Sequence, residues 1–330
     1  MVTSRDVAVA AGVSQATVSR ALADASKVSA ATRARVLAAV EQVGYVPNLT
    51  ARTMKTGRTG IVGVVVADLT NPFYPELLEA LGRALDAAGR RLTVWVADGP
   101  KNSAALQAIR ERSVDGVVFT TVVEESVELR SALDRHSPLV LVNRLLPGVD
   151  CDQVGSDNVA GGALVAEYLL AHGRRRIAFL GGEPSVSTTS DRLTGLRDRL
   201  AAAGAPLVAA AHGVYTHASG RAGTLDLLGG PRPPDALFCS NDLLAFGALD
   251  AARERGVQVP EDLWVVGYDD VEQAGWGTLS LTTVRQDVDR LASTAAELLL
   301  ARMDSPGEPP RQVTLEPELR VRRSTAHAPA

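Results

Sequence analysis

After residue 60 the chain alternates short aliphatic runs with amphipathic segments, and this alternation constrains the fold more than any other feature. Runs such as Ile61–Ala67, Leu139–Val142 and Ile177–Gly181 have the length and composition of buried strands. Segments with helical periodicity lie between such runs, for example Pro75–Gly89. Strands that alternate with helices predict parallel sheets of the doubly wound kind, with helices on both faces.

The same alternation continues to the end of the chain. Further strands are predicted at Leu92–Val96, Gly116–Thr121, Ala236–Cys239 and Trp264–Tyr268, and further helices at Ala160–His172, Ser190–Ala203 and Leu243–Arg255. These strands are too many for one sheet of this size, and 330 residues exceed one typical domain. We therefore predict two stacked α/β subdomains.

The first sixty residues have a different pattern, typical of short helices. Thr3 can cap a first helix, with Asp6 three residues on, and Gly12 stops that helix near Ala11. Ser14 can cap a second helix. A third helix is predicted from about Ser29 to Gly44, because Val36, Val40 and Val43 form one apolar stripe. These are the residues whose spacing predicts the three helices.

Three such helices would bury a small aliphatic core and leave Gln15, Ala16 and Arg20 exposed on the second helix. Arginine can donate two hydrogen bonds to guanine, glutamine can pair with adenine or bridge bases, and alanine can touch the methyl group of thymine. A helix of this kind suits a DNA major groove. Taken alone, however, so short a pattern favours the plainer interpretation, in which Gln15 and Arg20 are ordinary solvated residues.

The distribution of charge reverses that preference. Residues 1–60 contain eight basic and three acidic residues, a net charge of +5, whereas the whole chain carries −4 and the remainder therefore −9. A basic head on an acidic body places the affinity for nucleic acid at one end of the chain.

Composition excludes several other classes of protein. A hydrophobic content of 46% is enough for a sizeable core, and no run of about 18 apolar residues predicts a membrane span. The first residues lack the apolar core of a signal peptide, so we expect a cytoplasmic protein. Cys151 and Cys239 lie in different predicted strands and are expected to be reduced, buried thiols. We expect no metal and no cofactor.

No pattern of catalytic residues stands out. Neither a Ser-His-Asp arrangement nor an HExxH motif is evident. The run Ser156-Asp157-Asn158, followed by Gly161 and Gly162, lacks the spacing of the nucleotide-binding fingerprints. The sequence therefore does not predict an enzyme.

A series of motifs covers nearly the whole chain in a fixed order. They are Val2–Ala8, Ala11–Arg20, Val28–Ser29, Thr32–Arg33, Val36–Leu37, Gly44–Asn48, Ala51–Arg52, Asn71–Phe73, Phe238–Asp242, Val265–Asp270 and Leu281–Gln286. Together they resemble the lac repressor (LacI/GalR) family of bacterial transcription regulators. Motifs of this length in this order are far more specific than a single turn motif.

The resemblance implies a small all-α helix-turn-helix domain at residues 1–47, and a hinge helix with its linker at 48–59. The hinge would fold on DNA, pair with its twin in a dimer and open the minor groove. The family usually places leucine at the inserting position, where this chain has Met54; Met54 can also be a plain packing residue. The predicted DNA-binding residues are Thr3, Ser14, Gln15, Ala16, Thr17, Ser19, Arg20, Asn48, Ala51, Arg52, Met54 and Lys55.

The resemblance also implies that residues 60–330 form an effector-binding and dimerisation domain like the periplasmic sugar-binding proteins. The chain would cross between its subdomains three times, near Asp157–Gly161, Val284–Asp287 and Arg311–Leu315. The N-subdomain would then hold about 60–158 and 287–311, and the C-subdomain about 159–286 and 312–323. Ligands bind at the carboxyl ends of parallel strands and between such domains.

Most predicted effector residues lie just after strands or at a crossing, and Arg192 starts a helix; the resemblance, matched residue for residue, implies that they contact the effector. They are Phe73, Tyr74, Thr120, Asn143, Arg192, Tyr215, Asn241, Asp269 and Gln286. Charged and amide groups can bond vicinal hydroxyls, and an aromatic ring can pack on a sugar face. The family often has aspartate where Asn143 stands. For each single residue a structural role remains open; Asp269 can cap a loop, and Tyr215 can be core.

These implications predict a transcriptional repressor that binds a palindromic operator in double-stranded DNA and responds to a small effector, expected to be a sugar. A terminal heptad helix is missing, which favours a dimer over a tetramer. A sugar-binding protein without a regulatory role and an α/β enzyme remain the alternatives. The sequence leaves open the identity of the effector, the operator sequence and whether the effector releases or promotes DNA binding.

Overall fold

The computed structural model describes residues 2–23, 27–45, 57–97, 104–121 and 126–325. It divides the chain into two compact units, residues 1–59 and 60–330. Within the described ranges, no helix has both the length and the apolar character needed to cross a membrane.

The first unit contains the three predicted helices, α1 (Ser4–Ala11), α2 (Gln15–Ala23) and α3 (Ala30–Val43). Val7, Val18 and Val36 are fully buried and join the three helices in one small core. Gly12 ends α1 with a φ of 62°, a left-handed conformation that favours glycine. The sequence pattern alone was therefore sufficient to place these helices.

The second unit contains two six-stranded sheets, each in its own subdomain. The first sheet contains β1 (Ile61–Val66), β2 (Arg91–Val96), β3 (Gly116–Phe119), β4 (Leu139–Val142), β5 (Asp152–Ser156) and β11 (Gln312–Leu315). Its strands are all parallel, in the order β2-β1-β3-β4-β5-β11. This order confirms the predicted doubly wound arrangement.

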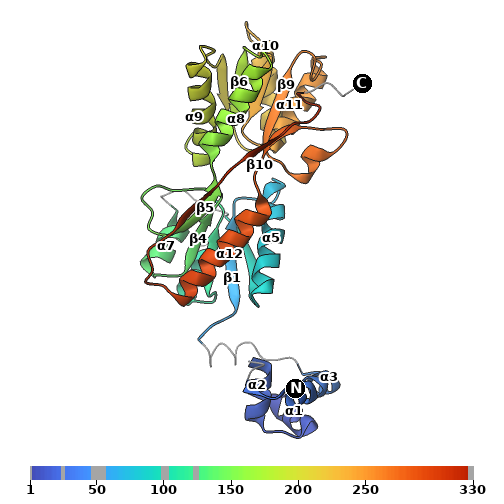
Figure 1. The fold of residues 1–330 in the computed structure, drawn as a ribbon, viewed down its shortest axis with the longest axis vertical. Coiled ribbons are helices and arrows are strands. Elements are labelled where there is room, and N and C mark those ends of the chain that lie inside the picture. Colours follow the sequence, from blue (N-terminus) through green and yellow to red (C-terminus); the bar gives the residue numbers. More distant parts are fainter. Residues whose placement is uncertain (1, 24–26, 46–56, 98–103, 122–125, 326–330) are drawn as a thin grey trace. The chain divides into compact units, whose positions relative to one another are not determined.

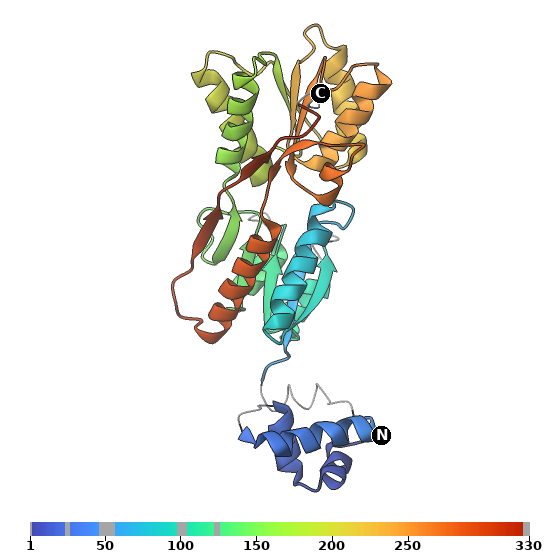
Figure 2. The ribbon, with the colours of Figure 1, turned by 45° about the vertical axis from the view of Figure 1, so that its right-hand side comes forward.

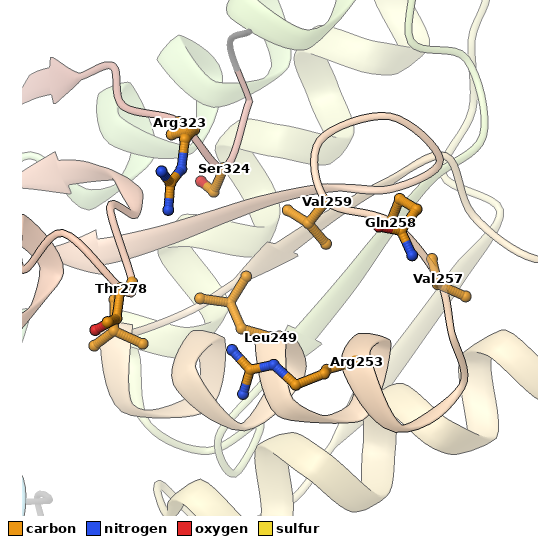
Figure 3. A pocket seen from close by; sticks show the side chains of 9 residues that line it. Leu249, Arg253, Val257, Gln258, Val259, Thr278, Arg323 and Ser324 are labelled. Carbon is orange, nitrogen blue, oxygen red and sulfur yellow. The ribbon is translucent and has the colours of Figure 1, made fainter. Parts of the chain in front are cut away.

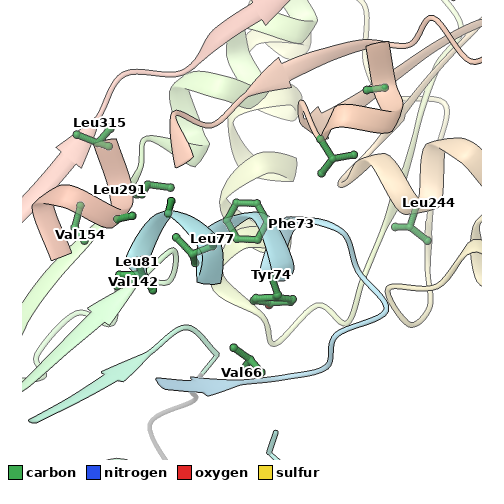
Figure 4. Close-up of a cluster of buried hydrophobic side chains, with 14 of the residues drawn as sticks. Val66, Phe73, Tyr74, Leu77, Leu81, Val142, Val154, Leu244, Leu291 and Leu315 are labelled. Carbon is green, nitrogen blue, oxygen red and sulfur yellow. The ribbon is translucent and has the colours of Figure 1, made fainter. Parts of the chain in front are cut away.

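Helices cover both faces of this first sheet. α5 (Phe73–Ala87) and α12 (Val288–Asp304) pack side by side on one face (Figures 1 and 2). α6 (Ala104–Glu111) and α7 (Val127–Asp134) pack together on the other face. Figure 4 shows the core of the first face, where Leu77 and Leu81 of α5 meet Val142 and Val154 of the sheet.

The second sheet has the same plan. Its strands are β6 (Ile177–Gly181), β7 (Ala209–His212), β8 (Ala236–Cys239), β9 (Trp264–Asp269), β10 (Thr282–Arg285) and β12 (Glu318–Arg320), in the order β7-β6-β8-β9-β10-β12. β12 is antiparallel to β10, whereas the other neighbours are parallel.

Two pairs of helices enclose this second sheet. α8 (Asn158–Ala171) and α9 (Ser187–Ala202) pack against one face, and α10 (His217–Gly229) and α11 (Asp242–Glu254) against the other. A short 3₁₀-helix, η2 (Glu272–Gly275), follows β9. Alternate residues of one strand serve the two faces: Phe179 packs towards α8 and α9, while Leu180 joins the opposite core.

The chain passes between the two sheets at residue 157, at 286–287 and at 316–317. The third passage lies beyond the predicted range Arg311–Leu315, because Gln312–Leu315 pairs in parallel with β5 in the first sheet. The first subdomain therefore includes β11, and the predicted boundary at residue 311 is corrected to 315. β11 was hard to predict because Gln312 and Thr314 are exposed polar residues on an edge strand.

Candidate functional site

A cleft lies between the two subdomains, at the carboxyl ends of strands from both sheets. Its lining residues are Asn71, Phe73, Tyr74, Asn143, Arg144, Thr188, Arg192, Tyr215, Asn241 and Asp269. Seven of the nine predicted effector residues are among them. The first four follow β1 or β4 of the first sheet, whereas in the second sheet Asn241 follows β8 and Asp269 ends β9.

Arg192 is the central cation of the cleft. The sequence SxxSDR places it on the inner side of α9, where its side chain is only 3% exposed. Its Nε donates to Asn158 Oδ1 at 2.8 Å, and its Nη1 donates to the carbonyl of Ser240. The guanidinium Cζ lies 3.5 Å from the ring centroid of Tyr268. These contacts hold the planar guanidinium group in one orientation.

Asp269 supplies the opposite charge. Its Oδ1 lies 3.7 Å from Arg192 Nη1 and accepts a hydrogen bond of 2.8 Å from Gln286 Nε2. Burial raises the pKa of Asp269 to about 6, although Arg192 and the hydrogen bond from Gln286 favour the ionised form. Asp269 also has a φ of 117°, which is rare for a residue other than glycine. The carboxylate is therefore held in the cleft at a cost in backbone strain.

Gln286 lies behind the cleft, where it joins the two subdomains. Its Oε1 accepts a hydrogen bond of 2.7 Å from Ser156 at the end of β5, and its Nε2 binds Asp269 at the end of β9. A longer contact of 3.5 Å reaches Asn143 Oδ1. Gln286 does not line the cleft, but its amide contacts two residues that do, Asp269 and Asn143.

Thr120 is the other predicted effector residue that does not line the cleft. It is fully buried, and its hydroxyl donates to the carbonyl of Val65 at 3.0 Å. It therefore fastens the end of β3 to β1, which is a structural role.

Aromatic side chains line the cleft, with Phe73 and Tyr74 as a wall of the first subdomain and Tyr215 on the second. The rings of Phe73 and Tyr74 are edge to face, with centroids 5.5 Å apart, and burial raises the pKa of Tyr74. On the second subdomain, the hydroxyls of Tyr215 and Thr189 are hydrogen-bonded at 2.5 Å. A wall of this kind suits the apolar face of a ring-shaped ligand.

Asn241 provides the most direct sign of a ligand. Its Oδ1 accepts the backbone N–H of Leu244 and caps α11, whereas its buried Nδ2 has no hydrogen-bond partner among the described residues. A buried amide N–H without a partner costs free energy on the order of 1–3 kcal/mol. A ligand hydroxyl or carbonyl in the cleft would remove that cost.

Sequence reasoning missed Asn71, Arg144 and Thr188. Asn71 belongs to a motif, Asn71-Pro72-Phe73, of which only Phe73 was assigned to the cleft, and its Oδ1 accepts the N–H of Phe73. Arg144 directly follows Asn143 after β4, so its position carried a usable signal. Thr188 lies one helical turn before Arg192, on the same side of α9.

The side chains fill most of the cleft, which has a cavity volume of about 30 Å³. Larger cavities lie elsewhere. One of about 250 Å³ is bordered by Leu249, Arg253 and Arg323 on the second subdomain (Figure 3), and one of about 810 Å³ lies beside the loop at 306–310. We favour the cleft because buried polar groups converge there from both subdomains, whereas Arg253 is largely exposed and paired with Asp250.

Apart from Thr3, the predicted DNA-reading residues that the structure describes lie on α2 or directly before it. Gln15, Ala16 and Arg20 are exposed. Ser14 caps the helix, since its Oγ accepts the N–H of Thr17 at 3.1 Å. Thr17 and Ser19 are partly exposed, and Thr3 is exposed before α1. The side chains of Gln15, Ala16 and Arg20 are thus accessible to the major groove of DNA.

The hinge residues Asn48, Ala51, Arg52, Met54 and Lys55 lie outside the described residues, so their roles remain predictions. Over the described ranges, no group of three or more histidine, cysteine, aspartate or glutamate side chains could hold a metal ion. Cys151 and Cys239 are buried free thiols. Cys239 lies in β8, whereas Cys151 directly precedes β5, so the prediction that Cys151 lies in a strand was wrong.

Comparisons with known proteins agree with both parts of this arrangement. Residues 3–48 match the model of the "bacterial regulatory proteins, lacI family", and residues 166–325 match a "periplasmic binding protein-like domain". The HTH-type transcriptional regulator GalR of Escherichia coli (strain K12) is 33% identical over 338 residues, which cover 100% of this chain and 97% of GalR.

Two solved structures are similar over the whole chain. The lac repressor dimer bound to operator and the anti-inducer ONPF has a TM-score of 0.83 and 28% identity, covering 98% of this chain and 99% of that one. A complex of the transcriptional regulator CelR with cellobiose has a TM-score of 0.74 and 31% identity, covering 98% of this chain and 100% of that one.

Proposed function

Because the chain belongs to the lacI family of bacterial regulatory proteins, which are DNA-binding regulators of transcription, we propose that it is a repressor. It binds a palindromic operator as a homodimer, and a small polyhydroxylated effector controls this binding. The observation that carries the proposal is the presence, in one chain, of an exposed recognition helix and a cleft with converging buried polar groups. A recognition helix does not require a ligand cleft, and a ligand cleft does not require a recognition helix. Their presence together favours a DNA-binding protein that a ligand controls.

The chemistry of the cleft favours a sugar as the effector. Arg192 and Asp269 offer a donor and an acceptor 3.7 Å apart, which is suited to two neighbouring hydroxyl groups. Asn241 Nδ2 offers a further donor, and Phe73 and Tyr74 offer an apolar wall. CelR, a similar protein, is described in complex with cellobiose, a disaccharide.

A dimer follows from the way such proteins read DNA. Palindromic half-sites require two recognition helices related by a two-fold axis. The similar lac repressor structure is a dimer on its operator. We propose that residues 48–56 form the hinge on DNA and that Met54 enters the minor groove there.

The proposed control is a change in the angle between the subdomains. A cavity of about 30 Å³ is far below the roughly 300 Å³ of typical ligand sites, so an effector needs a more open cleft to enter. Gln286 holds Ser156 of one subdomain and Asp269 of the other, so a ligand on Asp269 acts on the junction. An effector that favours one angle between the subdomains would shift the equilibrium of DNA binding.

The decisive test combines ligand and operator binding on the full chain. A thermal-shift screen against sugars and nucleobases identifies the effector, since a ligand at about 100 times its Kd adds roughly 2.7 kcal/mol to stability. Gel shifts with operator DNA should then show an affinity that changes with the effector. Affinity should also fall steeply with salt, with a slope of about −0.9 per phosphate contact.

A result without sequence-specific DNA binding at any salt concentration would contradict the proposal. In that case a sugar that still stabilises the protein would identify it as a binding protein without a regulatory role.

A further inference from the structure

The side chain of Gln15 is tied to Ser4, a residue of another helix. Gln15 Nε2 donates to Ser4 Oγ at 2.8 Å, and the two residues open α2 and α1 respectively. We infer that Ser4 is a determinant of operator sequence: its bond restrains the end of the Gln15 side chain where the remaining donor and acceptor of the amide can read adenine. This inference rests on the proposed function, because it requires α2 to enter the major groove of operator DNA.

Both partners are held by fixed helix termini. At the start of α1, Asp6 accepts the backbone N–H of Thr3 at 2.8 Å and the Thr3 hydroxyl at 2.9 Å. At the start of α2, Ser14 accepts the N–H of Thr17 and shares a hydroxyl–hydroxyl bond of 2.8 Å with the same residue. Because the two helices also pack on each other, the spacing between Ser4 and Gln15 is set by the fold.

The bond matters because the end of a glutamine side chain is otherwise free to rotate. The terminal torsion of glutamine is broad and roughly two-fold, so a half-turn exchanges the amide oxygen and nitrogen. A serine hydroxyl can accept from the amide nitrogen or donate to the amide oxygen, and in this structure the nitrogen is the donor. The bond to Ser4 therefore restrains where the end of the Gln15 side chain lies before DNA is bound.

A fixed amide matches adenine and mismatches guanine. With one Nε2 hydrogen on Ser4, Gln15 retains one N–H donor and the Oε1 acceptor. Adenine presents an acceptor at N7 and a donor at N6 in the major groove, which pairs with both. Guanine presents acceptors at N7 and O6, so Oε1 would face another oxygen. The class of ligand that Ser4 selects is thus an adenine edge.

Neither residue has another role that a substitution would disturb. Gln15 is exposed and Ser4 is partly exposed, so neither belongs to the core formed by Val7, Val18 and Val36. The start of α1 is capped by Thr3 and Asp6, and alanine is a good helix former. Ser4→Ala is therefore expected to fold normally, which thermal unfolding can verify.

The experiment measures operator preference with the full chain. Operators are first selected from randomised palindromic DNA. The position that Gln15 reads is the one at which the selected base changes in Gln15→Ala, and the Kd is then measured with adenine and with guanine at that position. The variants are Ser4→Ala, Ser4→Thr, Gln15→Ala and the double variant. An ordinary hydrogen bond changes an equilibrium by a few-fold to about tenfold, so Ser4→Ala should reduce the adenine preference by roughly three- to tenfold.

The controls separate orientation from other effects. Ser4→Thr keeps the hydroxyl and should keep the preference. Gln15→Ala should abolish the preference, and adding Ser4→Ala to it should then change nothing further. The slope of affinity against salt should be the same for Ser4→Ala and the parent protein, because the substitution removes no positive charge.

Two outcomes would overturn the inference while leaving the proposed function intact. Ser4→Ala could retain the full adenine preference, or it could weaken binding to all sequences equally, which would make Ser4 a contact to the DNA backbone. If the parent protein selects no sequence at all, the proposed function itself fails.

Discussion

Gln286 Nε2 donates to Asp269 Oδ1 at 2.8 Å, and this bond joins a residue at the second passage between the subdomains to the carboxylate of the cleft. Ser156, at the end of the first sheet, holds the other end of the same amide. The protonation and the position of Asp269 are thus linked to the junction on which the proposed control depends.

The first prediction concerns pH. Burial raises the pKa of Asp269 to about 6, so the carboxyl group of the free protein takes up a proton as the pH falls through that value. A protonated carboxyl loses acceptor strength for effector hydroxyls, so effector affinity should be constant above about pH 7 and fall by up to about tenfold per unit below pH 6. Calorimetric Kd values between pH 5 and 8 check this. Asp269→Asn should bind weakly with no such pH dependence, and an unchanged Kd at pH 5 in the parent protein would refute the assignment.

The second prediction concerns the shape of Arg192. Arg192→Lys keeps the charge but loses the planar group that binds Asn158 and Ser240 together, so one buried acceptor is left without its donor. We expect a loss of stability of about 2–3 kcal/mol and a loss of effector binding. Arg199→Lys, on the same helix with a 42% exposed side chain bonded to Glu167, is the matched control and should cost less than about 1 kcal/mol. Equal thermal shifts for the two variants would be evidence against the role of Arg192.

The third prediction concerns the contact between α8 and α9. A Cβ added to Gly195 would lie 1.9 Å from the carbonyl oxygen of Val159, so Gly195→Ala must push the two helices apart. Since Arg192 and Asn158 sit at this contact, the cleft should suffer as well. We expect a loss of more than about 2 kcal/mol.

Gly82→Ala is the matched control for this change. Gly82 is also in a helix, and nothing lies within 4 Å of its added Cβ. Alanine should therefore stabilise the protein by up to about 1 kcal/mol through helix propensity. Denaturant unfolding of both variants distinguishes the two cases; if Gly195→Ala is neutral, the close packing of α8 and α9 is not as described.

The fourth prediction concerns the buried carboxylate of Asp152. Its side chain has no exposed surface and binds Arg302 Nε at 2.8 Å, while Arg311 Nε lies 3.7 Å away. Arg302→Gln should cost about 3–5 kcal/mol because it removes the nearest cation from a buried carboxylate and leaves only the largely exposed Arg311. Arg311→Gln is the control: that side chain is 53% exposed, and its loss should cost less than about 1 kcal/mol. A reversed order in urea unfolding would contradict the pairing.

Local patterns in the sequence were sufficient for the helices of the first unit and for most buried strands. Residues such as Val64, Leu141 and Phe179 belong in a buried strand wherever it lies, because burial of apolar side chains drives the fold. The caps Ser14 and Asn241 are equally local, since each bonds the N–H three residues ahead. The motifs Phe238–Asp242 and Val265–Asp270 also indicated Asn241 and Asp269 as cleft residues.

The tertiary structure alone decided how distant segments meet. The edge strand β11 pairs with β5 across a separation of some 159 positions, as the bond from Arg311 N–H to Asp152 shows, and its exposed polar residues gave no periodic signal. The same holds for Thr120, whose hydroxyl is used within the sheet, for Gln286, which supports Asp269 from behind, and for the Ser4–Gln15 bond. A hydrogen bond between side chains from distant segments depends on distances that only packing sets. A helix cap or an apolar stripe depends on the spacing of residues close in sequence, so the sequence alone can predict it.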